Sequence, residues 1–477
     1  MRVENWGAAV TAGAAAQALA SSGSAWFWLD GEDAALGERR VSYLGVAAET
    51  RYAAAGHEGE FLAGLREFSR ARGASSSRAP SDGARKPSAD PLCAAGAGQG
   101  DALGAGLHTG WIVALGYEFG VGLLGVEPAP DPVAPGFALR CDAVLVLDHS
   151  AGTAALHGDE AAVARLREIL EPSLNDSGGR GAETQAVSSG RRGPDTPSWR
   201  GTDYNASVES CRAAIRRGDA YVLCLTDTVE TETDALPLEL YARVRGGATR
   251  GGVIVTPDRA LVSASPERFL SVVGRILRTH PIKGTRPRGS NATLDSALAA
   301  ELAADPKERA ENLMIVDLMR NDLTRVCAPG TVRVERFLEV ESHPRVHQLV
   351  STVAGELAGS ADVFDAIGSC FPGGSMTGAP KRSAVEILAS LEAGPRGLYS
   401  GCFGWIDDSG NAELAMTIRG VELRGPGLAG RGETGAAGGA VARVALVGAG
   451  GGITIDSDAA AEVRERDLKA AAMLAVL

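Results

Sequence analysis

Short runs of β-branched and aromatic residues recur along the chain, each bounded by polar residues, glycine or proline. Runs of this length and composition predict strands. They are SAWFWLD, GWIVALGYEF, DAVLVLDH, AYVLCLTDTV, GGVIVTPD, RILRTHPI, TVRVERFLEV and GCFGWIDD. Helical spacing of apolar residues instead predicts helices over 205–217, 305–323, 361–369, 380–392 and 458–475. Because strands arrive in pairs, without strict strand–helix alternation, the pattern favours antiparallel sheets with outer helices, an α+β fold.

Three stretches interrupt this pattern. Residues 71–107 and 174–198 are rich in Ala, Gly, Ser and Pro and lack periodicity, which predicts a surface insertion and a linker. The loop 424–440 separates two strand-like runs and predicts a long hairpin. We therefore expect an N-terminal region over 1–198 and a second region over 199–477, sharing one intertwined core.

The composition is that of a globular protein, with 45% hydrophobic and 22% charged residues. A net charge of −12 argues against nucleic acid or an anionic membrane as the main partner. No apolar run reaches the length of about 18 residues that a membrane span needs, and the N-terminus reads as mature protein rather than a signal peptide. Seven scattered cysteines without paired spacing predict reduced thiols and a cytoplasmic protein.

Lysine is scarce, because arginine supplies most of the 47 basic residues. The lysines are Lys86, Lys283, Lys307, Lys381 and Lys469. Where lysine persists in an arginine-rich chain, a compact or deprotonatable amine is a possible reason. Chance retention is the alternative for any single one of them.

Two predicted helices carry spaced carboxylates. Asp305 can cap the first helix, and Glu308 and Glu311 share one of its faces. The alternative is that Glu308 completes a capping box and Glu311 is solvated. On the last helix Glu462, Glu465 and Lys469 share a face, as in a salt-bridged surface stripe or a ligand set.

A glycine run, Gly448-Ala-Gly-Gly-Gly452, precedes that last helix. Backbone amides without Cβ atoms can approach an anion closely, although a tight turn would explain the glycines equally well. Together with the carboxylates and Lys469, the run is compatible with a site for Mg²⁺ and a carboxylate ligand.

Four further side chains could carry chemistry. Lys283 precedes a glycine and becomes a nucleophile if partly buried, or is an exposed loop lysine. Glu267 follows a strand and is either an acid or a turn cap. Ser375, in the loop FPGGSMTGAPK, could bind an oxyanion. Arg419 could clamp a carboxylate or simply lie on the surface.

The glycine pattern at 425–430 matches GxGxxG but is followed by RGETG rather than by a helix. A dinucleotide site needs that helix, so we disfavour a nucleotide-binding module.

Several motifs occur in the order found in the chorismate-utilising enzymes. They are PIKGTRPRG, KERAENLMIVDLMRNDL, VHQLVSTVAGEL, FPGGSMTGAPKRSAVEIL, RGLYSGCFGW, MTIR and a final segment in which GGGI is followed by Glu462, Glu465 and Lys469. The chain resembles that family over roughly 200–477, and WFWLDGEDAALGERRVSYLG resembles the N-terminal part of its synthase components. The resemblance implies antiparallel β-sheets packed face to face with helices outside, chorismate as substrate, Mg²⁺ as cofactor, and 199–477 as the catalytic region.

Within the family, Lys283 in the PI-x-GT motif resembles the aminodeoxychorismate synthases, since anthranilate synthases carry Ala there. The segment GDAYVLCLT lacks the lysine base of the water-adding isochorismate and salicylate synthases. The alternatives are an anthranilate synthase component I and a catalytically silent chorismate-binding paralogue.

The resemblance also implies roles. Lys283 would attack C2 of chorismate while Glu267 acts as the acid for the departing C4 hydroxyl. The substrate-binding residues would be Thr285, Ser375, Tyr399, Arg419, Gly450, Gly451, Gly452 and Lys469. The Mg²⁺-binding residues would be Glu308, Glu311, Glu462 and Glu465. Gln348 stands where many relatives have histidine, and we leave the preceding His347 out of the catalytic set.

A glutaminase would need a cysteine nucleophile with distant His and Glu, and no such pattern is present. We therefore expect a separate glutaminase subunit to deliver ammonia for 4-amino-4-deoxychorismate, the precursor of p-aminobenzoate in folate biosynthesis.

Overall fold

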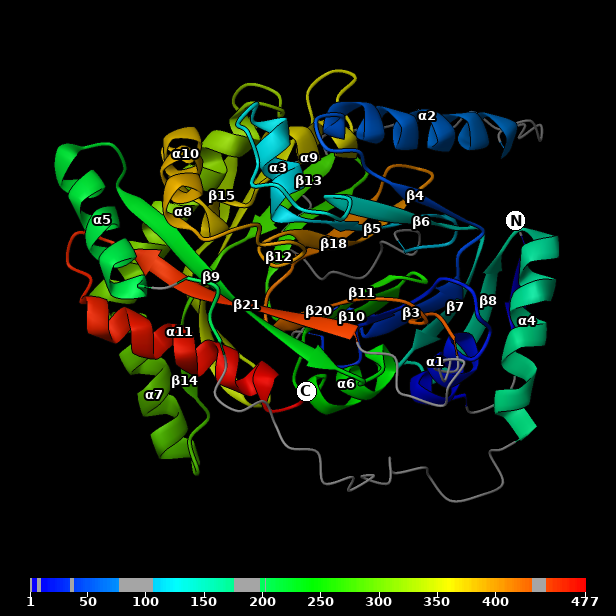
Figure 1. Ribbon diagram of the computed structural model, residues 1–477. Helices are drawn as coiled ribbons and strands as arrows, with labels where there is room; N and C mark the ends of the chain where they lie inside the picture. Colours follow the sequence, from blue (N-terminus) through cyan, green and yellow to red (C-terminus); the bar gives the residue numbers. More distant parts are fainter. Residues whose placement is uncertain are drawn as a thin grey trace.

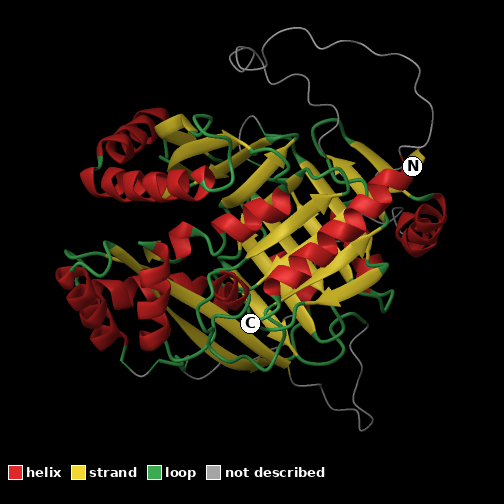
Figure 2. Cartoon of the chain, turned by 90° about the horizontal axis from the view of Figure 1, so that it is seen from above, coloured by secondary structure: helices red, strands yellow, loops and turns green. Residues whose placement is uncertain are grey.

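The computed structural model describes residues 2–6, 10–34, 38–76, 106–175, 198–201, 203–430 and 443–477. Its strands form two antiparallel sheets that lie face to face, with helices on the outer sides (Figures 1 and 2). The α+β fold class predicted from the strand pattern is therefore confirmed. The predicted insertion and linker fall largely on 77–105 and 176–197, outside the described residues.

The first sheet has eleven strands and draws on both ends of the chain. Their order is β1 (Arg2–Asn5), β8 (Thr153–Gly158), β7 (Ala143–Asp148), β3 (Val41–Val46), β2 (Trp26–Asp30), β10 (Arg250–Val255), β11 (Arg259–Ser265), β20 (Gly420–Arg424), β21 (Arg443–Ile453), β9 (Val222–Thr233) and β17 (Gly378–Ala379). β2 pairs directly with β10, so the sheet joins the two regions that the linker separates in sequence.

The second sheet has ten strands. Nine follow the order β14 (Ile282–Pro287), β16 (Val346–Glu356), β13 (Ile276–His280), β12 (Arg268–Val273), β19 (Ala412–Met416), β18 (Cys402–Asp407), β5 (Gly110–Leu115), β6 (Gly136–Cys141) and β4 (Glu49–Tyr52). The tenth, β15 (Arg333–Ser342), pairs with β16. β20 and β21 pair as the predicted hairpin, although residues 431–442 between them lie outside the description.

The helices flank the sheets. They are α1 (Ala12–Ala20), α2 (Glu58–Ser76), α3 (Tyr117–Leu123), α4 (Glu160–Asn175), α5 (Tyr204–Arg217), α6 (Pro237–Val244), α7 (Ala292–Ala304), α8 (Pro306–Thr324), α9 (Val363–Cys370), α10 (Lys381–Leu391) and α11 (Ala459–Leu474). All five predicted helices are present. The predicted strand over 110–119 is wrong in its last part, because Gly116 caps α3 and packs against the Gly397 carbonyl, where a Cβ would lie 2.6 Å away. No helix within the described ranges is long and apolar enough to cross a bilayer.

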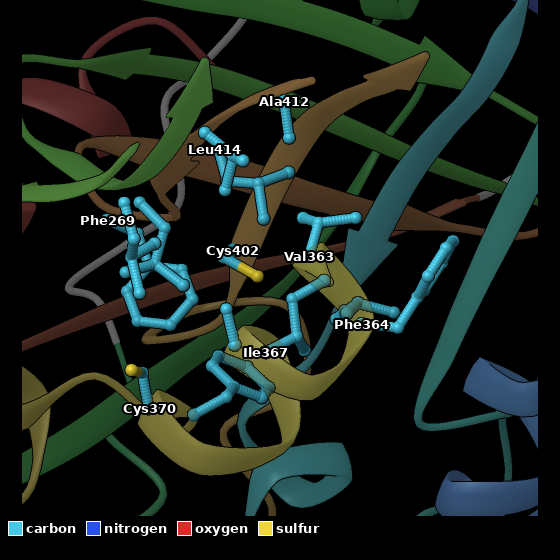
Figure 3. Close-up of a cluster of buried hydrophobic side chains, with 14 of the residues drawn as sticks. Phe269, Val363, Phe364, Ile367, Cys370, Cys402, Ala412 and Leu414 are labelled. Carbon is cyan, nitrogen blue, oxygen red and sulfur yellow. The ribbon is translucent and has the colours of Figure 1, made fainter. Parts of the chain in front are cut away.

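Alternation along β5 shows how the layers are filled. Trp111 and Val113 join a core beneath the outer helices, whereas Ile112 and Ala114 join the core between the two sheets. Because both faces are buried, the strand is hydrophobic throughout. Figure 3 shows the outer core, where Phe364 and Ile367 of α9 lie against the second sheet near Cys402 and Leu414.

Candidate active site

Two segments pass from one sheet to the other side by side, and each carries a predicted site residue. Glu267 lies between β11 and β12, and Arg419 lies between β19 and β20. The Ala264 N–H donates to the Arg419 carbonyl at 2.9 Å, and the Met416 N–H donates to the Glu267 carbonyl at 3.0 Å. These bonds fix the two residues as neighbours although they are 152 positions apart in the chain.

Glu267 lies among cationic and hydroxyl groups. Burial raises the pKa of its carboxyl group. The positive charges of Lys283 and Arg419 and a hydrogen bond from Ser375 lower that pKa in part. Ser375 reaches this position from a 3₁₀ turn, Gly374–Met376, that follows α9. A raised pKa keeps a carboxyl group protonated to higher pH, which favours the role of a general acid.

Lys283 lies in strand β14 and is half-buried, so the alternative of an exposed loop lysine is wrong. The next residue, Gly284, has φ +79°, and a Cβ there would lie 2.8 Å from Leu302 and 3.0 Å from Glu308. Gly284 also shifts the register: Lys283 pairs with Leu349 but Thr285 pairs with Gln348. Leu349 and Gln348 are adjacent in β16, and adjacent residues of a strand point to opposite faces. Their partners follow them, so Thr285 lies on the opposite face of the sheet from Lys283.

Both ring nitrogens of His347 contact side chains of the protein. Its Nε2 lies 2.9 Å from Asp295 Oδ1 and its Nδ1 lies 2.8 Å from Ser342 Oγ. The neighbouring Gln348 is buried opposite Thr285. Both ring nitrogens are thus engaged, and the omission of His347 from the catalytic set stays a prediction.

The glycine run lies within the long strand β21, which excludes the tight-turn alternative. In the partner strand β9, the Thr226 N–H donates to the Glu392 carboxylate and the Cys224 N–H donates to the Thr377 carbonyl. Both amides therefore point away from β21. Gly450 and Gly452, which face these two residues, are therefore non-hydrogen-bonded pairs whose amides point to the free edge of β21.

At that free edge the Lys469 ammonium donates to the Gly450 carbonyl at 2.8 Å. Gly448, further along the strand, lies under the ring of Tyr399, where a Cβ would lie 2.2 Å from Cδ1 and Cγ. The strand from Gly448 to Gly452 therefore carries amides that point away from β9, an ammonium at Gly450 and an aromatic ring at Gly448.

The four predicted metal ligands form two pairs, and each has a partner from the protein. Glu308 lies 3.7 Å from Arg286 and Glu311 lies 3.8 Å from Lys307. Lys469 contacts Glu465 at 2.7 Å. Glu462 accepts from Ser457 at 2.8 Å, and a Cβ on Gly451 would lie 3.0 Å from its Oε2. Asp305 caps α8 as predicted, but Glu308 extends over Gly284 rather than completing a capping box.

The chemistry of these side chains fits Mg²⁺, which prefers carboxylate oxygens. Burial raises the pKa values of Glu308 and Glu462, and the neighbouring carboxylate adds to the effect in each case. Among the described residues, however, no three acidic, histidine or cysteine side chains are close enough to hold one ion together. The pairs face cations of the protein instead, so a metal ion would have to draw them together.

Sequence reasoning missed the buried support of the site. Arg396 donates from its Nη1 to the Met376 carbonyl at 2.8 Å and from its Nη2 to the Cys224 carbonyl at 2.9 Å. It also pairs with Glu392 at 2.7 Å and reaches Ser400, next to Tyr399. Its place in the motif RGLYSG was the available signal, but the sequence does not show that it joins the Ser375 turn, β9 and Tyr399.

Comparison with known proteins identifies the group to which the chain is related. Residues 32–475 match the family described as chorismate binding enzyme. An aminodeoxychorismate synthase from Streptomyces pristinaespiralis is 36% identical over 389 residues, which cover 78% of this chain and 51% of that protein. An anthranilate synthase component 1 from Arthrobacter globiformis is 40% identical over 283 residues, which cover 58% and 50%. The chain thus spans about half the length of the curated relatives it matches.

Solved structures share the fold. The anthranilate synthase component I from Streptococcus pneumoniae superposes with a TM-score of 0.63 at 24% identity, covering 99% of this chain and 92% of that one. The menaquinone-specific isochorismate synthase from Escherichia coli gives 0.64 at 18% identity, covering 100% and 94%. With the family match extending over most of the sequence, these findings show that the chain belongs to the family of chorismate binding enzymes.

Proposed function

We propose that this chain is the aminating component of an aminodeoxychorismate synthase, which converts chorismate and ammonia to 4-amino-4-deoxychorismate. The observation that carries the proposal is the half-buried Lys283 close to Glu267, in a site where Ser375 and Arg419 also converge. An amine beside a carboxyl group of raised pKa suits a displacement in which a nucleophile attacks and a hydroxyl group departs.

The reaction would proceed in two displacements. The neutral Lys283 amine forms a bond to C2 of chorismate, the double bonds shift, and the C4–O bond breaks as Glu267 donates its proton to the leaving hydroxyl. Ammonia then forms a bond to C4, the double bonds shift back, and the C2–N bond to Lys283 breaks. The Glu267 carboxylate accepts the proton that ammonia loses, so the site returns to its first state and water is the second product.

The remaining groups would orient the dianionic substrate. The exposed Arg419 side chain and Tyr399 suit the enolpyruvyl carboxylate, and the amides of Gly450 and Gly452 with Lys469 suit the ring carboxylate. Glu308, Glu311, Glu462 and Glu465 would hold Mg²⁺, which when bound supplies positive charge to that carboxylate. The local cations allow a dianion to bind to a protein with net charge −12.

A product assay tests the proposal. The purified chain is mixed with chorismate, Mg²⁺ and ammonium, with and without an aminodeoxychorismate lyase, and the products are separated by mass. We expect an amino-deoxychorismate mass that becomes p-aminobenzoate only with the lyase. Anthranilate as product would refute the proposal in favour of the second candidate, which the similarity to anthranilate synthases keeps open. A glutaminase subunit as the ammonia source is tested by glutamine-dependent turnover after that subunit is added.

A further inference from the structure

We infer that a small cavity beside Tyr399 is a binding site for ammonia, the second substrate of the proposed reaction. The inference rests on the proposed function for the identity of this ligand. The cavity has a volume of about 10 Å³, enough for a single water-sized molecule. It lies between strands β11, β20 and β21 of the first sheet and the segment that carries Tyr399.

The cavity adjoins the proposed chorismate site. Tyr399 and Gly448 form part of its wall and are half-buried, whereas Thr417, Glu422 and Arg396 are buried. C4 of chorismate, which ammonia must attack, is bonded to the carbon that bears the enolpyruvyl ether. Since Tyr399 is proposed to hold the carboxylate of that ether, a molecule bound beside Tyr399 would lie near the carbon that it must reach.

The Thr417 hydroxyl group needs a partner in this cavity. Thr417 is 3% exposed, and its hydroxyl oxygen has no hydrogen-bond partner within the described part of the chain. Its peptide groups are paired, because the Ser400 N–H donates to the Thr417 carbonyl at 2.9 Å and the Thr417 N–H donates to the Gly401 carbonyl at 2.8 Å. A buried hydroxyl group is unfavourable unless it is hydrogen-bonded, so the side chain indicates a polar ligand.

Glu422 supplies an acceptor to the same cavity. Burial opposes ionisation of its carboxyl group, but the charges of Arg259 and Arg424 outweigh burial and lower its pKa to about 2. The carboxylate accepts from Arg259 Nε at 2.8 Å, from Arg424 Nε at 2.6 Å and from the Leu398 N–H at 2.7 Å. An ionised carboxylate can accept about four hydrogen bonds, so Glu422 can accept one more.

Arg396 also lines the cavity, but its donors are already used elsewhere. A guanidinium group has five N–H donors. Here two of them bond the Glu392 carboxylate and one each bonds the Met376 carbonyl, the Cys224 carbonyl and the Ser400 hydroxyl. The ligand must therefore donate hydrogen bonds rather than accept them from Arg396.

These groups select a small neutral donor. A cation would find the charge of Glu422 already neutralised by two arginines, and an anion would be repelled by the carboxylate. Ammonia has three N–H donors and one lone pair, so it can donate to Glu422 and exchange a hydrogen bond with Thr417. Water has the same size but only two donors, and it is the competing occupant.

Steady-state kinetics of the full chain test the inference, with ammonium as the varied substrate at saturating chorismate and Mg²⁺ and mildly alkaline pH. Thr417→Val replaces the hydroxyl group by a methyl group of similar shape, and Thr417→Ser keeps the hydroxyl group. Thr279→Val is the matched control. Thr279 is also buried, but it lies in β13 of the second sheet, and its hydroxyl group contacts the Met319 sulfur at 3.5 Å.

We expect Thr417→Val to raise the KM for ammonium roughly 2- to 10-fold, because one hydrogen bond to the ligand is lost. Thr417→Ser should restore most of this loss, and Thr279→Val should match the wild type. The affinity of Thr417→Val for chorismate, measured by calorimetry, should not change. An unchanged KM for ammonium in Thr417→Val, an equal rise in Thr279→Val, or a parallel loss of chorismate affinity would overturn the inference, the first of these indicating water as the occupant.

The comparison applies to any aminated product, so the two hypotheses can fail separately. The expected change in KM with anthranilate as product would refute the proposed function alone. Formation of 4-amino-4-deoxychorismate without that change would refute the ammonia site alone. The absence of any ammonium-dependent product would refute both.

Discussion

Replacing Gly448 by alanine tests whether the strand edge and Tyr399 form one binding surface. The added methyl group would lie 2.2 Å from two ring atoms of Tyr399, whereas ordinary contacts begin near 3.4 Å, so the ring must retreat by about 1 Å. Retreat is restricted, because the Ser400 N–H donates to Thr417 and Ser400 Oγ accepts from Arg396. Overpacking of this kind typically costs about 1–3 kcal/mol.

The free energy can appear as lost stability or as lost affinity for chorismate, where it corresponds to roughly 5- to 150-fold. Gly368→Ala is the control, because Gly368 lies in α9, outside the proposed binding residues, and an added Cβ there would meet no atom within 4 Å. Chorismate affinity is measured by calorimetry, and stability by thermal denaturation, for both variants. If Gly448→Ala binds chorismate as tightly as Gly368→Ala does and is no less stable than the wild type, the proposed contact between Tyr399 and the strand edge is refuted.

Three further changes test the chemistry and the support of the site. Lys283→Ala should lose most activity, and intact-protein mass spectrometry should detect no chorismate adduct; a full rate would remove its role as nucleophile. Burial raises the pKa of Glu118 to about 7. As pH rises, this carboxyl group therefore loses its proton in the unfolded chain before it does so in the folded one. The free energy of unfolding should fall by roughly 3 kcal/mol between about pH 4.5 and pH 7 for this reason. Denaturation of the wild type and Glu118→Gln at pH 5 and pH 7.5 checks this. An equal change in the free energy of unfolding between the two pH values for both proteins would contradict it. In the wild type the buried Asp322 carboxylate lies 2.7 Å from the Lys381 ammonium. Lys381→Met would leave Asp322 as a buried unpaired charge and should lower the free energy of unfolding by about 3–5 kcal/mol, measured by thermal melts. The added substitution Asp322→Leu should restore much of this loss, and failure to do so would refute the assignment.

Local patterns predicted the elements near the site well, because their ends carry explicit capping residues. Asp305 and Asp458 cap α8 and α11 through their side chains, as expected for helices that begin after an aspartate. The glycine-rich part of β21 was harder to predict, since glycine weakens strands. Eleven consecutive partners along β9 outweigh that local preference.

The convergence of the site could not be derived from spacing alone. Glu267 and Arg419 meet because two distant segments cross between the sheets together, which no local pattern encodes. The resemblance to chorismate-utilising enzymes supplied candidate residues, and the structure supplies their neighbours.

The pairing of β2 with β10 has a consequence for synthesis of the chain on the ribosome. Trp26 lies opposite Val255, so the inner edge of β2 has no partner until more than two hundred further residues have been made. At about 5–20 residues per second this interval lasts roughly 10–45 s. During that time WFWLD presents an apolar strand edge to other nascent chains. Expression yield should therefore depend on chaperones that shield the first region, and the two regions made as separate polypeptides should aggregate unless they are produced together.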